Sequence, residues 1–192
     1  MTTNDGKYWI TFNGEFYNYK ELRKELEALN YVFLSDSDTE VLLNCWREWG
    51  ENCITRITGM FAFVIYDIHH ETLTCVRDAF GIKPFYYFID ENRFYFSSEV
   101  PSILSLFTDK VKLNAASVLN YLLRSSYDVA HFTQTEEVKA LAPGSILTVN
   151  IKEKLSFSLK RWWEPSIAED KTISFEAATR KLKELFLKSV RL

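Results

Sequence analysis

Residues 59–67, with the sequence GMFAFVIYD, restrict the possible folds of this chain more than any other stretch. The run is almost continuously apolar and lacks the alternation of apolar and polar residues that marks a strand with one face in water. A strand of this kind is covered on both faces. The sheet that contains it therefore needs a layer of structure on each side, which the rest of the chain must supply.

Further apolar segments predict the elements around this strand. Segments rich in aromatic and β-branched residues, separated by turn residues, predict hairpins, and apolar residues at helical spacing predict amphipathic helices. The predicted strands are 7–12, 31–33, 72–78, 85–89, 93–98, 145–149 and 155–159, and the predicted helices are 19–29, 38–49, 101–107, 114–123 and 174–192. Helices, then hairpin strands, then helices again indicate an α+β sandwich rather than alternating βαβ units.

The composition argues against several classes of protein. Hydrophobic residues make up 47% of the 192, and the 23 basic and 26 acidic residues are spread along the chain, so we expect a large core and no nucleic-acid partner. The apolar runs are too short for a membrane span, and the first residues lack the pattern of a signal peptide, so the expected location is cytoplasmic. Three widely spaced cysteines without a CxxC motif indicate neither a disulfide framework nor a zinc site.

Asn13 and Gly14 follow the strand predicted over 7–12 and precede the first predicted helix. Asn-Gly is a common tight-turn pair, so one interpretation is a simple turn. The pair also offers a side-chain amide and an unhindered backbone N–H at one point, and these are the two donors of an oxyanion hole. Asn18, with Glu21 three residues later, predicts a capping box at the start of the helix.

A second polar segment, 35–40, precedes the helix that ends at Trp49. Ser37 or Asp38 can cap this helix, and Glu40 suits its first turn. A capping residue can face a pocket at the same time, so Asp38 is also a candidate ligand-binding carboxylate. A calcium loop is a third interpretation, but the glycine and the distal glutamate of that motif are missing.

A third segment begins with Arg77 and Asp78, at the end of the strand predicted over 72–78. These two residues suggest a partly buried ion pair that supports the fold. Gly81, before Ile82-Lys83-Pro84, suggests a turn that needs a positive φ.

Taken together and in this order, the three segments resemble the class II glutamine amidotransferase domain. More narrowly, they resemble the glutaminase domain at the N-terminus of asparagine synthetases. The matching segments are 13–18, 35–41, 77–87 and 97–99, and two others that fit the same family are 59–63 and 143–145. Each segment alone is a weak signal, but the joint match is highly specific and covers nearly the whole chain.

The resemblance implies a fold and a site. The fold would be an αββα sandwich of antiparallel sheets of the N-terminal-nucleophile-hydrolase type. Asn13 would offer its amide, and Gly14 its backbone N–H, to the oxyanion of a tetrahedral intermediate. Glu15 and Asp38 would hold the α-ammonium group of L-glutamine, since a desolvated ammonium needs a negative partner. The remaining substrate contacts implied by the family would again involve Asn13 and Gly14.

The resemblance also implies a reaction and partners. In the family, an N-terminal cysteine whose own amine serves as base hydrolyses glutamine. The ammonia passes to a synthetase domain in cis that uses ATP and Mg to amidate aspartate to asparagine. This chain itself would then bind no cofactor and no metal, and the parent enzyme would be a homodimer.

The start of the chain departs from the family. The family places a cysteine after the initiator Met and, several dozen residues later, the Asn-Gly-Glu strand, with a carboxylate-gripping arginine in the interval. Here twelve residues precede Asn13, and none of them is Cys or Arg. We therefore expect the nucleophile and the first strands of the sandwich to be missing and the chain to be inactive alone. Thr2, which removal of Met1 would expose, matches a surface loop rather than the nucleophile strand.

The three cysteines are not expected to replace the nucleophile. Cys45 and Cys75 fall on a buried helix face and in a strand, and Cys53 lies near a helix end with no His partner at motif distance.

The end of the chain also departs from the family. The helix predicted over 174–192 resembles the first helix of the synthetase domain, whose pyrophosphate-binding loop would follow it. We therefore assign 1–164 to a partial amidotransferase domain, and 165–192 to a linker and the first helix of the synthetase domain.

The leading interpretation is thus the glutaminase part of an asparagine-synthetase-like enzyme. Two alternatives stay open. One is the glutaminase domain of a related amidating synthetase in natural-product or polysaccharide biosynthesis, whose acceptor would be chosen by residues after Leu192. The other is a non-catalytic scaffold or interaction module that keeps the sandwich without the chemistry.

Overall fold

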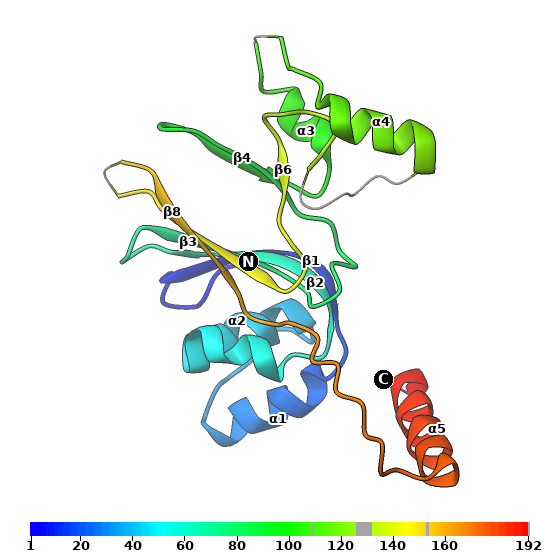
Figure 1. Ribbon diagram of the computed structural model, residues 1–192. Helices are drawn as coiled ribbons and strands as arrows, with labels where there is room; N and C mark the ends of the chain where they lie inside the picture. The colour runs from blue at the N-terminus through cyan, green and yellow to red at the C-terminus, as the bar shows by residue number, and fades with distance from the viewer. Residues whose placement is uncertain (109, 126–131, 153, 192) are drawn as a thin grey trace.

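The chain folds into stacked layers of helices and antiparallel sheets (Figure 1). The structure, a computed structural model, describes residues 1–108, 110–125, 132–152 and 154–191. Two helices, α1 (Tyr19–Ala28) and α2 (Asp38–Trp49), cover one face of a five-stranded sheet. A three-stranded sheet covers the opposite face, and α3 (Val100–Leu104) packs on the outside of that smaller sheet. The predicted α+β fold, an αββα sandwich of antiparallel sheets, is confirmed.

The larger sheet has the strand order β1-β2-β3-β7-β8, and the smaller sheet has the order β5-β4-β6. Neighbouring strands are antiparallel throughout both sheets. The strands are β1 (Tyr8–Phe16), β2 (Gly59–Asp67), β3 (Thr72–Arg77), β4 (Tyr86–Ile89), β5 (Phe94–Ser97), β6 (Lys139–Ala140), β7 (Ser145–Asn150) and β8 (Ser156–Arg161). Of the eight predicted strands, all except 31–33 are present, with differences at their ends, and β6 is an addition.

Strand β2 lies between two hydrophobic cores, as its continuous apolar sequence predicts. Phe61, Phe63 and Ile65 point into the core beneath α1 and α2. Ala62 and Val64 point into the core between the two sheets. All five are buried, so both faces of the strand are covered and no polar alternation is needed.

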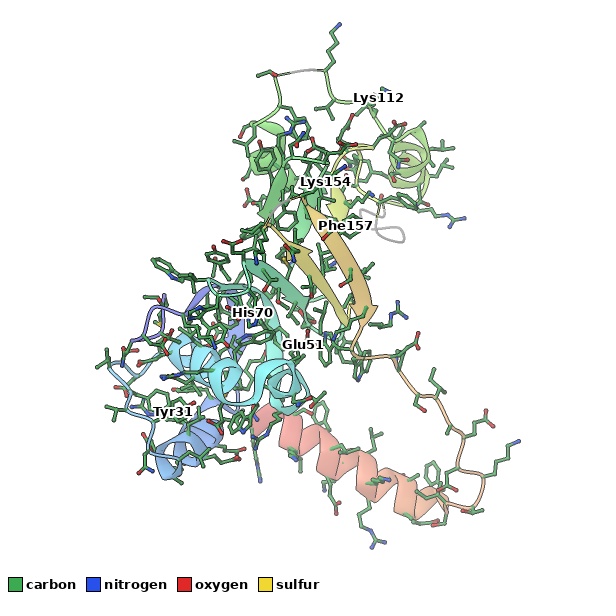
Figure 2. All side chains as sticks on the ribbon, turned by 90° about the vertical axis from the view of Figure 1, so that its left-hand side faces the viewer. Tyr31, Glu51, His70, Lys112, Lys154 and Phe157 are labelled. Carbon is green, nitrogen blue, oxygen red and sulfur yellow. The ribbon has the colours of Figure 1, made fainter. Side chains whose placement is uncertain are left out.

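The remaining elements frame this sandwich. A 3₁₀ helix, η1 (Gly50–Arg56), follows α2, and Gly50 ends α2 with a positive φ of +54°. Helix α4 (Ala115–Arg124) begins at Asn114, whose side chain accepts a hydrogen bond from the Ser117 N–H as a cap. Beyond β8, which carries the labelled Phe157 in Figure 2, an extended segment leads to α5 (Phe175–Arg191), and no α5 residue is buried.

Two local predictions were wrong. The capping box at Asn18 does not form, because the Asn18 amide bonds instead to the segment before β2: it accepts from the Thr58 N–H at 2.8 Å and donates to the Arg56 carbonyl at 3.0 Å. Residues 31–33 form no strand. This loop is held by side chains, since the Tyr31 hydroxyl donates to Glu48 at 2.9 Å (Tyr31 is labelled in Figure 2).

Within the described ranges, no helix combines the length and the apolar character that crossing a membrane would require.

Candidate functional site

The sequence predicted that the first strand ends before Asn13. In the structure, strand β1 continues through Asn13, Gly14 and Glu15 to Phe16. Asn13 lies opposite Ala62 and Gly14 opposite Phe61 in the register with β2. The long apolar partner strand outweighs the local preference of Asn-Gly for a turn, because strand preference depends on the neighbours that a strand can pack against. Asn13 and Gly14 are therefore extended residues of a sheet.

The hydrogen-bond pattern of β1 determines where the Gly14 N–H points. The Tyr17 N–H donates to the Thr58 carbonyl at 2.9 Å, and the Ile68 N–H donates to the Lys7 carbonyl at 3.1 Å. Both bonds follow the β1–β2 register, so the odd-numbered residues of β1 bond to β2. In an antiparallel pair the alternate residues point their N–H groups the other way. The Gly14 N–H therefore points outward, away from β2.

The outer side of β1 is an edge of the larger sheet. Two other outward N–H groups of β1 have identified partners there. The Ile10 N–H donates to the Met1 carbonyl at 2.9 Å, and the Phe16 N–H donates to Asp38 Oδ2 at 3.1 Å. Gly14 lies two residues before Phe16, or about 7 Å along the strand. The structure thus brings the Gly14 N–H and the Asp38 carboxylate to the same edge.

Gly14 is required here by the close approach of β2. A Cβ atom at this position would lie 2.3 Å from the Met60 carbonyl oxygen and 2.8 Å from Phe61 Cα. Both atoms belong to the backbone of β2, which cannot move aside without breaking its own pairing. A side chain at position 14 would therefore displace the N–H that faces the edge.

A cavity of about 470 Å³ opens at this edge, and we call it the edge cavity. It includes three of the four predicted site residues: Gly14, Glu15 and Asp38. Asp36 is a further acidic residue of this lining, in which no lysine or arginine is found among the described residues. Such a lining suits a cationic group. Within the described residues, no group of three His, Cys, Asp or Glu side chains is arranged to hold a metal ion.

Asn13 lies beside a different cavity. Side chains alternate along a strand, and Asn13 is paired with Ala62, whose side chain lies between the sheets. The cavity there measures about 250 Å³, and its lining includes Asn13, Phe85, Phe96 and Ser97. The four predicted residues are therefore neighbours along β1 and the start of α2, but they line two cavities.

The Asp38 carboxylate is held from two sides. Ser37 is the helix cap, because its hydroxyl oxygen accepts from the Thr39 N–H at 3.2 Å, and Asp38 is the first residue of α2. Asp38 Oδ2 accepts from Phe16, and Oδ1 accepts from the Thr39 hydroxyl at 3.3 Å. A carboxylate has about four acceptor positions, so Asp38 keeps capacity for a ligand.

Sequence reasoning missed two residues behind the edge cavity, Glu40 and Arg23. The Glu40 carboxylate accepts hydrogen bonds from the N–H groups of Leu34 and Ser35 and from the Ser35 hydroxyl, and Arg23 donates to the Ser35 carbonyl at 2.8 Å. The spacing of Ser37 and Glu40, which matches a capping box, was the available signal. In the folded chain Glu40 reaches past the cap to the loop before it.

Comparison with known proteins decides the family of this chain. The family model described as "Glutamine amidotransferase domain" matches residues 1–163. The chain belongs to this family.

Relatives of this amidotransferase domain include several asparagine synthetases. "Asparagine synthetase [glutamine-hydrolyzing] 1" of Bacillus subtilis is 39% identical over 157 residues, which are 82% of this chain and 24% of the relative. "Asparagine synthetase [glutamine-hydrolyzing] 3" of the same species is 32% identical over 183 residues, 95% of this chain and 29% of the relative. The chain thus spans less than a third of the length of these relatives.

A solved structure supports the fold of the amidotransferase domain. Glutamine phosphoribosylpyrophosphate amidotransferase from B. subtilis matches with a TM-score of 0.56 at 17% identity, over 85% of this chain and 31% of that one. At this identity the likeness shows a shared fold. The N-terminal-nucleophile-hydrolase type of sandwich, predicted from the sequence, is thereby confirmed.

In the amidotransferase domain, the loop after β3 is held by Arg77 and Asp78, both buried. The Asp78 carboxylate accepts from the N–H groups of four residues, which are Phe61, Phe80, Ile82 and Lys83. The Arg77 guanidinium donates to three carbonyls, those of Gly81, Lys83 and Leu141. Gly81 has the expected positive φ, +66°. Hydrogen bonds between these two side chains and the backbone thus hold the loop in place.

The cysteines of the amidotransferase domain lie away from the edge cavity. Cys45, Cys53 and Cys75 are fully buried in the hydrophobic cores. Burial raises the pKa of the Cys45 thiol to about 12, and it raises the pKa of the Cys53 and Cys75 thiols well above the ordinary value. Thiols in this state are poor nucleophiles, since the thiolate is the reactive form.

Thr2 also lies apart from the predicted site. It forms an isolated bridge opposite Trp9, four residues before Asn13 on β1. At the rise of a strand, this separation is about 13 Å. The Thr2 hydroxyl donates to the Tyr8 carbonyl at 3.0 Å, on the side of the strand start.

Proposed function

We propose that this chain carries the glutamine-recognition part of the glutaminase domain of an asparagine-synthetase-like enzyme. The observation that carries the proposal is the meeting of the Gly14 N–H and the Asp38 carboxylate at the outer edge of β1. These are a donor for an oxyanion and an acceptor for an ammonium group, about 7 Å apart along the strand, in a chain of the glutamine amidotransferase family.

The substrate proposed is L-glutamine, with its ammonium group at the acidic end of the edge cavity. Asp38 and Glu15 would accept hydrogen bonds from the ammonium group, and their charge would compensate its loss of water. The side-chain amide of glutamine would extend along β1, so that its carbonyl oxygen approaches the Gly14 N–H. The Asn13 amide, which lies beside the cavity between the sheets, would turn around the edge of β1 to reach the same oxygen. Two such donors stabilise the oxyanion that forms during hydrolysis, and loss of one costs about 10²–10³ in rate.

We further propose that this 192-residue polypeptide does not itself hydrolyse glutamine. Hydrolysis of this type needs a nucleophile beside the oxyanion donors. The buried thiols with raised pKa values do not reach the edge cavity, and Thr2 lies about 13 Å from Asn13 along the strand. The site would then bind the substrate, but neither the three thiols nor Thr2 would supply the nucleophile for hydrolysis.

The context of the parent enzyme is part of the proposal. Relatives named as glutamine-hydrolysing asparagine synthetases support a role in delivering ammonia to an ATP- and Mg-dependent amidation of aspartate. That step would take place in a synthetase domain in cis, which residues 165–192 would join to the amidotransferase domain. We also propose that the parent enzyme is a cytoplasmic homodimer.

A ligand titration tests the proposal. L-Glutamine added to the ¹⁵N-labelled chain should shift the amide resonances of Gly14 and Phe16 to saturation. Glutaramate, which is glutamine without its α-amino group, should bind at least about tenfold more weakly, because it lacks the charge that the carboxylates recognise. An ammonia assay on the same sample should give no signal above a heat-denatured blank. Equal binding of both ligands, or of neither, would contradict the proposal and favour a non-catalytic interaction module.

A further inference from the structure

We infer that Glu40, together with Arg23, positions the Asp38 carboxylate for the substrate ammonium group. This inference deepens the proposed function and rests on it, because the role of Asp38 in binding glutamine is itself part of that proposal. Glu40 does not line the edge cavity, so its role would be exerted through the loop that leads to Asp38.

The Glu40 carboxylate forms a clamp on the loop before α2. Oε1 accepts from the Leu34 N–H at 2.8 Å, and Oε2 accepts from the Ser35 N–H at 2.7 Å and from the Ser35 hydroxyl at 2.6 Å. Both carboxylate oxygens are thus in use, and all three bonds are short. Charge-assisted bonds of this kind are stronger than neutral ones.

Arg23 holds the same loop from α1. Its guanidinium donates to the Ser35 carbonyl at 2.8 Å and to Asp36 at 3.1 Å, and it lies over the Phe33 ring at 4.6 Å from the ring centre. Glu27, one turn further along α1, orients the guanidinium through a contact of 3.0 Å. The loop is therefore held by hydrogen bonds from Arg23 of α1 and to Glu40 of α2.

The clamp reaches Asp38 through two further bonds. The Ser35 hydroxyl, held by Glu40, accepts a hydrogen bond from the Ser37 N–H at 3.3 Å. Ser37 then caps α2, and Asp38 follows with its carboxylate bonded to the Phe16 N–H. If the loop became more mobile at Ser35, the start of α2 would also become more mobile, and the hydrogen bond from the Phe16 N–H to Asp38 would weaken.

The substitution Glu40→Gln tests this arrangement with little change in size. An amide has one acceptor oxygen and one NH₂ group, so the NH₂ group would face the donors that now bond to a carboxylate oxygen. The bonds to Leu34 and to Ser35 could not both survive. The matched control is Glu48→Gln, also on α2, because the Glu48 carboxylate accepts from the Tyr31 hydroxyl outside the clamped segment.

The first readout is amide hydrogen exchange at Phe16, which reports the bond to Asp38 without any ligand. Glu40→Gln should raise the exchange rate of the Phe16 amide by about tenfold, as local opening becomes easier, while Glu48→Gln should leave it within about twofold. The second readout is the dissociation constant for L-glutamine, which should rise about fivefold in Glu40→Gln only. Unchanged Phe16 exchange in Glu40→Gln would overturn the inference, even if the wild-type chain binds glutamine.

Two outcomes separate this inference from the proposed function. If the wild-type chain does not bind glutamine, the proposed function fails and the substrate role of the clamp fails with it, whereas the exchange at Phe16 still decides whether the clamp positions Asp38. If Glu40→Gln does not fold, Arg23→Lys replaces it, since lysine keeps the charge but loses the forked donors. Arg23→Lys should raise Phe16 exchange about threefold, and exchange equal to wild type would overturn the inference.

Discussion

Asp38 Oδ2 lies 3.1 Å from the backbone nitrogen of Phe16, so the first residue of α2 closes the outer edge of β1. The bond joins two residues that are 22 positions apart in the chain. It sets the distance between the carboxylate of Asp38 and the outward N–H of Gly14, two residues earlier on the strand. The candidate site is therefore a product of the β1–α2 packing.

Gly14→Ala should destabilise the chain by about 3 kcal/mol, because the new Cβ would meet the backbone of β2 at 2.3 Å. Gly6→Ala is the comparison, since Gly6 has a positive φ of +67° but no atom within 4 Å of a built Cβ. It should cost about 1 kcal/mol, the ordinary cost of that backbone conformation. Urea unfolding followed by circular dichroism measures both. If Gly14→Ala lowered the free energy of unfolding less than Gly6→Ala does, the close approach of β2 to Gly14 would be contradicted.

Asp78→Ala should be among the most destabilising substitutions in the chain. It would leave four backbone N–H groups without their acceptor at a buried position, at a cost on the order of 3–5 kcal/mol. Asp90→Ala is the control, because Asp90 also accepts from backbone N–H groups, those of Asn92 and Arg93, but in an exposed turn. Its effect on the urea midpoint should be much smaller, and similar midpoints for the two variants would disprove the role given to Asp78.

The thiols should be unreactive in the folded chain. All three cysteines are buried, and burial raises their pKa values, so little thiolate exists at pH 7. Ellman's reagent should detect almost no thiol in the native protein and all three after unfolding in guanidinium chloride. A thiol that reacts within seconds in the native protein would show a nucleophile that the structure does not provide.

Glu40 should make stability depend on pH in the acidic range. Its partial burial would raise its pKa, but hydrogen bonds from Ser35 and Leu34 and the charge of Arg23 outweigh this and lower the pKa below the ordinary 4.5. A carboxyl with a lowered folded pKa adds stability above its unfolded pKa, and this stability is lost as the pH falls through the folded value. The stability difference between wild type and Glu40→Gln should therefore be largest near pH 7 and shrink below about pH 4. If the stability difference between the two proteins grew as the pH fell, the pKa of Glu40 would not be lowered in the folded chain.

Much of the fold follows from hydrophobic pattern. The continuous apolar run of β2 predicted a strand with two covered faces, and the helical spacing in 38–49 predicted α2. Predictions failed where a distant partner outweighs local preference. Asn13-Gly14 suggested a turn, but pairing with β2 extends the strand. Residues 31–33 suggested a strand but pair with none of the described strands.

The candidate site was partly accessible from sequence. The order of the motifs pointed to Asn13, Gly14, Glu15 and Asp38, and the structure places three of these at one cavity. The Asn13 side chain lies on the opposite face of β1, which the register alone determines. Arg23 could not have been linked to Ser35 from the sequence, because the contact depends on how α1 and the following loop pack.

Binding of L-glutamine to three versions of the chain tests the central claim most directly. Isothermal titration calorimetry should detect binding to the wild type and to Asp90→Asn, which makes the same chemical change in an exposed turn outside the edge cavity. In Asp38→Asn the dissociation constant should rise by about tenfold or more, the usual effect of losing a charged hydrogen-bond partner. If Asp38→Asn binds glutamine as tightly as Asp90→Asn and the wild type, Asp38 does not recognise the substrate, and the proposed site is wrong.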